Sequence, residues 1–257
     1  MHYIFAVILS IVEGISEFLP ISSTGHLILA SDILRIPQTD FQKSFEIFIQ
    51  LGAILSVVLL YRDTLLHSIK VWERVLIAFI PTGILGLTLF KLIKNYLLGN
   101  TSVVLTSLFL GGIALIILEK LHKEKDFHIE EMEKITYKQA FLIGLFQSIA
   151  MVPGVSRSAA TIFGGLYLGL KRKTAVEFSF LLAVPTMVAA TGLDLVKSHA
   201  YFTSQEFILL SIGFIGSFIT AYMTIKYFLK YIKTHNFIQF GVYRIVMSLA
   251  FWFLVVR

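Results

Sequence analysis

The sequence predicts an all-α polytopic integral membrane protein with about six transmembrane helices and two re-entrant helical hairpins in an inverted-topology repeat. Of its 257 residues, 56% are hydrophobic and 15% are charged, and the mean hydropathy is +0.81. A soluble domain carries roughly 25% charged residues. Two polar segments interrupt the apolar runs, EGISEFLPISSTGH at 13–26 and PGVSRSAAT at 153–161. We therefore expect one membrane domain over 1–257.

Six segments are close to the length that a transmembrane helix needs, which is about 20 mostly apolar residues. They are the ranges 45–61, 75–92, 102–119, 175–193, 206–225 and 238–256. The chain contains no cysteine, so neither a disulfide framework nor a thiolate metal site is available.

Two further apolar stretches are too short to span. Residues 3–12 are apolar for ten positions only, which reaches about half-way across a bilayer core at 1.5 Å per residue. The first polar segment follows, and residues 27–30 close the stretch. Residues 139–170 repeat this plan around the second polar segment. We therefore expect two re-entrant hairpins, 3–30 and 139–170. Their non-helical turns are tolerated at membrane depth only where protein or a water-filled cavity surrounds them.

Loop charges predict the orientation. Fourteen of the 22 Lys and Arg residues lie in 62–74, 120–138, 171–173 and 226–235, whereas the alternate loops and the C-terminus hold six. Basic loops stay on the cytoplasmic side, so both termini are expected outside. The same distribution explains the net charge of +6 without a nucleic-acid partner.

With this orientation the two hairpins enter the membrane from opposite faces, which is typical of an inverted repeat. The expected repeats are 1–119 and 137–257. An offset of 134 residues aligns Ser22 with Ser156 and Glu13 with Gln147. The two polar segments should then meet near the midplane.

The first polar segment carries two carboxylates, Glu13 and Glu17, that share one helix face at i,i+4. Such carboxylates repel unless a proton or a cation lies between them. Mg²⁺ and Ca²⁺ take oxygen ligands, and Mg²⁺ commonly combines one or two carboxylates with substrate phosphates. These residues are therefore candidate metal ligands; the alternative is one protonated, purely structural Glu.

Three nearby side chains are candidate nucleophiles: Ser22, Ser23 and His26. His26 can exchange a proton near neutral pH or attack phosphorus, but a lone membrane histidine is often only a packing residue. The two serines are either nucleophiles or caps for the half-helix that follows. The sequence leaves this choice open.

The second polar segment is a candidate anion site. Gly154, Ser156 and Ser158 precede or begin a half-helix, and helix N-termini bind anions through free N–H groups. Arg157 adds a guanidinium that suits phosphate oxygens. The alternative role of Arg157 is a salt bridge to Glu13 or Glu17. Carboxylates for a cation, a histidine and an anion cradle together indicate a diphosphate site.

Two further acids, Glu46 and Glu177, each begin an apolar span. We expect them to be exposed or to cap their helices, outside the functional site.

The two polar segments closely resemble the paired motifs of the undecaprenyl-diphosphate phosphatases, the bacitracin-resistance family. FEIFIQLGAIL at 45–55 and EFSFLLAVP at 177–185 resemble the family's flanking segments in the same order, and the resemblance covers nearly the whole chain. It implies a bacterial inner-membrane hydrolase that removes the terminal phosphate of the C55 diphosphate with Mg²⁺ or Ca²⁺. By motif position it implies a functional set comprising Glu13, Glu17, Ser22, Ser23, His26, Ser156, Arg157 and Thr161.

Residues and resemblance together predict catalytic roles for Glu17, Ser23, His26 and Arg157, with substrate binding by Ser22, Gly154, Ser156, Ser158 and Thr161. The expected function is hydrolysis of undecaprenyl diphosphate; the alternative is a secondary transporter or lipid-phosphate flippase that uses the same midplane site. A phosphatidic-acid-phosphatase type of site is excluded because 158–170 contains no second histidine. The metal, the nucleophile, the prenyl chain length and a homo-oligomeric state stay open.

Overall fold

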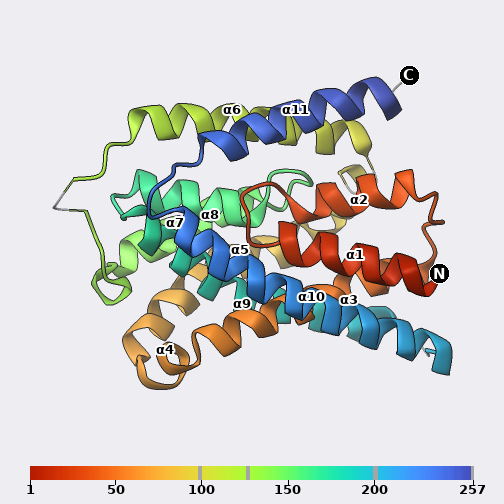
Figure 1. Cartoon of the computed structure of the whole chain (residues 1–257). Coiled ribbons are helices and arrows are strands. Elements are labelled where there is room, and N and C mark those ends of the chain that lie inside the picture. The colour runs from red at the N-terminus through yellow and green to blue at the C-terminus, as the bar shows by residue number, and fades with distance from the viewer. Residues whose placement is uncertain (98–99, 126–127, 199–201, 256–257) are drawn as a thin grey trace.

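The computed structural model describes residues 1–97, 100–125, 128–198 and 202–255, and its regular elements are helices (Figure 1). Apart from the 3-10 turn Met132–Lys134, they are, in chain order, α1 (Tyr3–Ser16), α2 (Ser23–Ile33), α3 (Asp40–Leu60), α4 (Arg62–His67), α5 (Ile69–Tyr96), α6 (Thr101–Leu121), α7 (Tyr137–Ile149), α8 (Arg157–Tyr167), α9 (Arg172–Ser198), α10 (Ser204–Tyr231) and α11 (Ile238–Val255).

Five of the six predicted spans are confirmed as helices long and apolar enough to cross a membrane. These are α3, α5, α6, α9 and α10. The sixth prediction falls on α11, whose described apolar part, Ile238–Phe253, is a shorter helix. The chain is therefore an all-α, multi-pass membrane protein.

Each of the two ranges predicted as a hairpin holds a pair of short helices. The first pairs α1 with α2 through the first hairpin turn, residues 17–22, and the second pairs α7 with α8 through the second hairpin turn, residues 150–156. Helix α1 has 14 residues, or roughly 21 Å of length against an apolar core of about 30 Å. Each turn therefore lies part-way across the apolar core rather than at its far side.

The two turns end in the same local geometry. Ser22 and Ser156 have φ of 74° and 76°, the left-handed region that side chains rarely adopt. Each is the N-cap of the helix that follows, and each hydroxyl accepts from the backbone N–H three residues on, that of Gly25 or Ala159. The serines are 134 residues apart, the offset that the sequence predicted for the repeats.

Long helices from the opposite half of the chain enclose each hairpin. Helix α1 packs along α10, α7 packs along α5, and α3 with α9 and α6 with α11 complete the bundle (Figure 1). Small residues allow these close approaches: a Cβ on Gly14 would overlap the Thr220 hydroxyl, and one on Gly144 would overlap the Ala78 carbonyl.

The basic loops gather at one end of the bundle. Helix α4, the segment between α6 and α7, the start of α9 and the link between α10 and α11 lie together, and the N-terminus lies at the opposite end (Figure 1). Ion pairs at the basic end join these segments, including Arg172–Glu119 and Lys171–Glu130. The described geometry thus separates the charge-rich end from the end that bears the N-terminus.

The α5–α7 contact depends on a glycine. We expect Gly144→Ala to destabilise the protein by about 1–3 kcal/mol, because the new methyl group overlaps the backbone of α5. Thermal unfolding in detergent measures the change. Gly192→Ala on α9 is the control, since a Cβ there meets nothing within 4 Å; equal melting temperatures for the two variants would contradict the proposed contact.

Candidate active site

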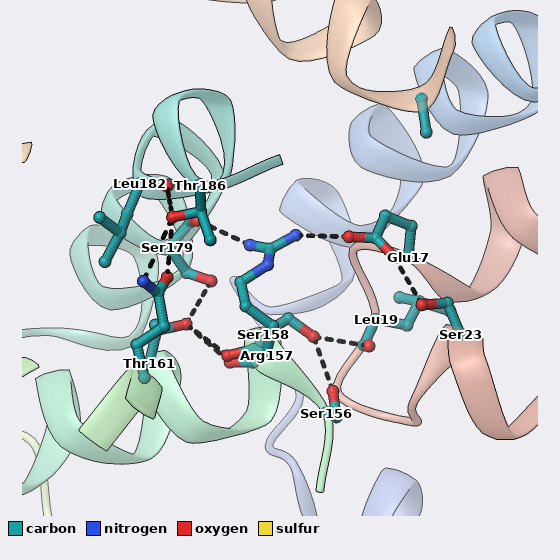
Figure 2. Close-up of polar contacts among 12 residues, drawn as sticks. Glu17, Leu19, Ser23, Ser156, Arg157, Ser158, Thr161, Ser179, Leu182 and Thr186 are labelled. Carbon is teal, nitrogen blue, oxygen red and sulfur yellow. Dashed lines mark hydrogen bonds and ion pairs between the residues drawn. The ribbon is translucent and has the colours of Figure 1, made fainter. Parts of the chain in front are cut away.

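The two hairpin turns meet through a buried ion pair. Arg157 Nη2 lies 2.9 Å from Glu17 Oε1, and the side chains are only 8% and 4% exposed (Figure 2). Ser158 Oγ donates to the Leu19 carbonyl at 2.8 Å and so joins α8 to the first turn. The polar segments therefore form one site, and the salt bridge considered for Arg157 is formed with Glu17.

A cavity of about 130 Å³ lies between the two turns. Six of the predicted residues line it: Glu17, Ser22, Ser23, Gly154, Ser156 and Arg157. Ala150 and Pro153 of the second turn, Thr24 of α2, Gln50 of α3 and Met187 of α9 complete the lining. Sequence reasoning missed Gln50, although a polar residue at the centre of the apolar run that follows Glu46 was a usable signal.

Ser23 is paired with a carboxylate. Its hydroxyl donates to Glu17 Oε2 at 2.5 Å (Figure 2). Glu17 is the C-cap of α1 and Ser23 is the first residue of α2, so the first hairpin turn brings them together. Because Arg157 holds the other carboxylate oxygen, Glu17 is fixed to receive a proton from Ser23. A hydroxyl bonded to a fixed base is the arrangement that activates a serine nucleophile.

His26 lies away from the cavity. Its Nδ1 is 2.8 Å from the Ser22 carbonyl, and its Nε2 is 2.7 Å from the Tyr243 hydroxyl. A carbonyl only accepts, so Nδ1 carries the proton and, in the neutral ring, Tyr243 donates to Nε2. The two rings are stacked, with centroids 5.5 Å apart. Both ring nitrogens are thus engaged outside the cavity.

Glu13 is fully buried, and neither of its carboxylate oxygens has a hydrogen-bond partner among the described residues. A buried carboxylate without compensation is costly, so this site calls for a proton or a cation. No cluster of three His, Cys, Asp or Glu residues exists in the described part of the chain. Glu13 does not line the cavity, and the Glu17 oxygens are bonded to Arg157 and Ser23. The pair therefore suits Mg²⁺ or Ca²⁺ only through the free Glu13 oxygens and the remaining lone pairs of Glu17, with water and phosphate oxygens as the other ligands.

Hydrogen bonds from residues of α8 and α9 fix the position of Arg157. Its Nη1 donates to the Ser179 carbonyl at 2.9 Å, and Thr161 Oγ1 donates to the Ser179 hydroxyl at 2.6 Å (Figure 2). The structure thus places Thr161 and Ser158 behind the cavity wall. The buried Arg157 Nε has no hydrogen-bond partner among the described residues, so it is available as a donor next to the start of α8, and helix starts are positions where anions bind.

Sequence reasoning also missed Arg244. Although it lies inside the apolar segment 238–256, its side chain is fully buried and donates to five backbone carbonyls. A charge within a span costs about 2.5–3.5 kcal/mol even on lenient scales, and this signal could have identified the residue.

The expectation for Glu46 and Glu177 was wrong as to exposure. Glu46 is half-buried and accepts from Gln42 Nε2 at 2.7 Å and from Ser31 Oγ at 3.2 Å. The side chain of Glu177 is only 18% exposed. Packing of α2 against the start of α3 explains the burial of Glu46, and neither acid lines the cavity.

Fold and site together define a polytopic membrane enzyme with a serine, a carboxylate and an arginine around a buried cavity. The sequence model of the family described as "Bacitracin resistance protein BacA" matches residues 6–250, and the chain belongs to this family.

Similar proteins cover nearly the whole chain. Proteins named undecaprenyl-diphosphatase are 56% identical in Aquifex aeolicus, over 96% of each chain, and 53% identical in Persephonella marina, over 98% of each. One from Methanococcus aeolicus is 46% identical over the full length of both. The family resemblance predicted from the two polar segments is thereby confirmed.

We expect the Glu17–Arg157 pair to be strongly coupled. Removing one partner leaves a buried charge uncompensated and should cost about 3–5 kcal/mol, whereas Glu17→Gln/Arg157→Met should cost less than the sum of the single changes. A double-mutant cycle by thermal unfolding measures this coupling. The exposed Lys134–Glu131 pair is the control, with an expected coupling of about 0–1 kcal/mol. Additive effects at Glu17 and Arg157 would refute the buried pair.

Proposed function

We propose that the chain hydrolyses undecaprenyl diphosphate to undecaprenyl phosphate and inorganic phosphate. This reaction recycles the carrier lipid of cell-wall synthesis, and abundance of the enzyme confers resistance to bacitracin. The observation that carries the proposal is the hydrogen-bonded series Ser23–Glu17–Arg157 at the cavity between the hairpins. The family membership and the names of the relatives support the substrate.

Of the three candidate nucleophiles, the geometry favours Ser23. Ser22 also lines the cavity, but its hydroxyl caps α2, and His26 faces Tyr243. Glu17 takes the proton of Ser23 as Oγ attacks the terminal phosphorus, and the bond from phosphorus to the bridging oxygen breaks. Undecaprenyl phosphate departs with that oxygen, and Glu17 passes its proton to the departing phosphate. Water then attacks the phosphoserine and gives a proton to Glu17, which hands it to Oγ as the bond from phosphorus to Oγ breaks, so phosphate is released and Ser23 is restored.

The second hairpin turn would bind the phosphoryl group that is transferred. Phosphoryl transfer requires mainly positioning and charge neutralisation. Arg157, the first residue of α8, and Ser156 line the cavity, and Arg157 Nε is a buried donor without a partner among the described residues. These groups suit the phosphate oxygens. Gly154, with φ of +90°, allows the turn to pass close to α6. The prenyl chain would lie sideways between the spans, in the bilayer.

Glu13 and Glu17 would hold a Mg²⁺ or Ca²⁺ ion. When bound, such an ion supplies positive charge against the diphosphate. His26 supports the reaction as a positioning residue, because its Nδ1–H fixes the carbonyl of Ser22, next to Ser23.

We further propose a location in the bacterial plasma membrane, with both termini outside and the repeats 1–119 and 137–257 inverted. The matched turn geometry of Ser22 and Ser156 and the basic end of the bundle support this arrangement.

Phosphate release from undecaprenyl diphosphate in detergent tests the function, because a pure transporter releases none. We expect Ser23→Ala to lower turnover about 1,000-fold, as loss of a nucleophile does. Ser22→Ala and His26→Ala should lower it about tenfold or less, and chelation of divalent cations should reduce it reversibly. Substantial turnover in Ser23→Ala together with none in His26→Ala would reassign the nucleophile. Normal turnover in Arg157→Ala would refute the site.

The absence of cysteine makes the orientation testable with single cysteines. Asp40→Cys and Asp63→Cys replace carboxylates on exposed side chains near opposite ends of α3. We expect an impermeant maleimide to label only position 40 in intact cells, and both positions after permeabilisation. Labelling of position 63 alone would reverse the topology.

A further inference from the structure

Arg244 on α11 is a fully buried guanidinium whose observed partners are all backbone carbonyls. Nη1 donates to Pro20 at 3.3 Å and to Val155 at 3.0 Å. Nη2 donates to Gly154 at 3.0 Å and to Ser107 at 3.2 Å, and Nε donates to Leu108 at 3.3 Å. One side chain thus bonds the first hairpin turn, the second hairpin turn and α6.

Arg244 satisfies backbone carbonyls that have no partner within a helix. The turns leave carbonyls without intrahelical partners, and burial removes the water that would otherwise satisfy them. Packing alone would favour an apolar residue here, because burying a cation costs several kcal/mol. A guanidinium differs in offering five donors in a rigid planar fork. Lysine offers three donors from one point and cannot reach carbonyls on three segments.

The bonded carbonyls flank the reacting residues. Pro20 lies three residues after Glu17 and three before Ser23, and Val155 lies two residues before Arg157. Because Nη1 bonds both Pro20 and Val155, a shift of the guanidinium changes the spacing between the serine half and the arginine half of the site.

We propose that Arg244 is a positioning residue for phosphoryl transfer. It sets the separation of the two hairpin turns, so that Ser23 and Arg157 contact the same phosphate group. It acts through the backbone and does not touch the substrate. The inference rests on the proposed function for its catalytic consequence. The competing view is that Arg244 only anchors α11.

Two variants perturb the guanidinium in different ways. Arg244→Lys removes the fork, and Gly111→Ala keeps it but displaces it, because the new Cβ would overlap the guanidinium. Two controls perturb the same α6–α11 contact without touching the fork. Gly241→Ala places a Cβ against the Gly112 carbonyl and the Ile116 side chain, and Ser248→Ala removes the hydrogen bond to Leu105.

Kinetics on the monodisperse, folded fraction separate the two views. We expect Arg244→Lys and Gly111→Ala to lower kcat about 100-fold, the effect of roughly 1 Å of misplacement, with KM changed less than about threefold because the prenyl tail binds elsewhere. Gly241→Ala and Ser248→Ala should retain kcat within about twofold. Equal loss in the controls, or near-normal kcat in both guanidinium variants, would overturn the proposal.

Hydrogen exchange gives a readout that does not depend on turnover. Amides in residues 17–22 and 150–156 should exchange about tenfold faster in Gly111→Ala than in Gly241→Ala, with α3 and α9 unchanged. Unchanged exchange in both turns would refute the inference that Arg244 holds the two hairpin turns in place. If the wild type releases no phosphate but the variants show this exchange pattern, the proposed function is refuted, whereas the positioning of the two turns by Arg244 stands. The two failures are therefore distinguishable.

Discussion

Non-helical backbone in the interior of a membrane bundle is the constraint from which the remaining features follow. Each hairpin turn must satisfy its carbonyls and N–H groups without bulk water. The serine caps at 22 and 156, the Ser158 bond to Leu19 and the Arg244 fork all answer this need. The polar groups that satisfy the turns also make the centre polar, so the same solution creates a place where a charged headgroup can react.

Charge balance at this centre is the physical argument for the divalent cation that we propose. Glu17 and Arg157 neutralise one another, and Arg244 is occupied by carbonyls of the turns. A diphosphate in the cavity adds further negative charge, and the buried Glu13 carboxylate, four residues before Glu17, has no hydrogen-bond partner among the described residues. In a low dielectric, that excess is costly unless a positive ion accompanies the headgroup. This balance supports the proposal that the carboxylate pair forms half of a cation site.

The sequence predicted the hairpins and the meeting of the polar segments because polar groups inside apolar runs are energetically conspicuous. It could not predict which face each side chain takes. The rotation of α2 directs Ser23 into the cavity and His26 toward Tyr243, and that of α8 places Thr161 behind Arg157. These directions depend on packing between halves of the chain. Arg244 obeyed the same rule as Arg157 and was still missed, because no motif surrounded it.

The two halves of the site have equivalent local positions but complementary chemistry. Ser23 and Arg157 are each the first residue of a half-helix, directly after a capping serine with positive φ. An inverted repeat brings equivalent positions face to face at its centre, so whatever stands at the first helical residue of one hairpin meets its counterpart. Identical residues would give two nucleophiles or two repelling cations. One serine and one arginine, joined through Glu17, instead give a nucleophile and an anion-binding group on the same cavity.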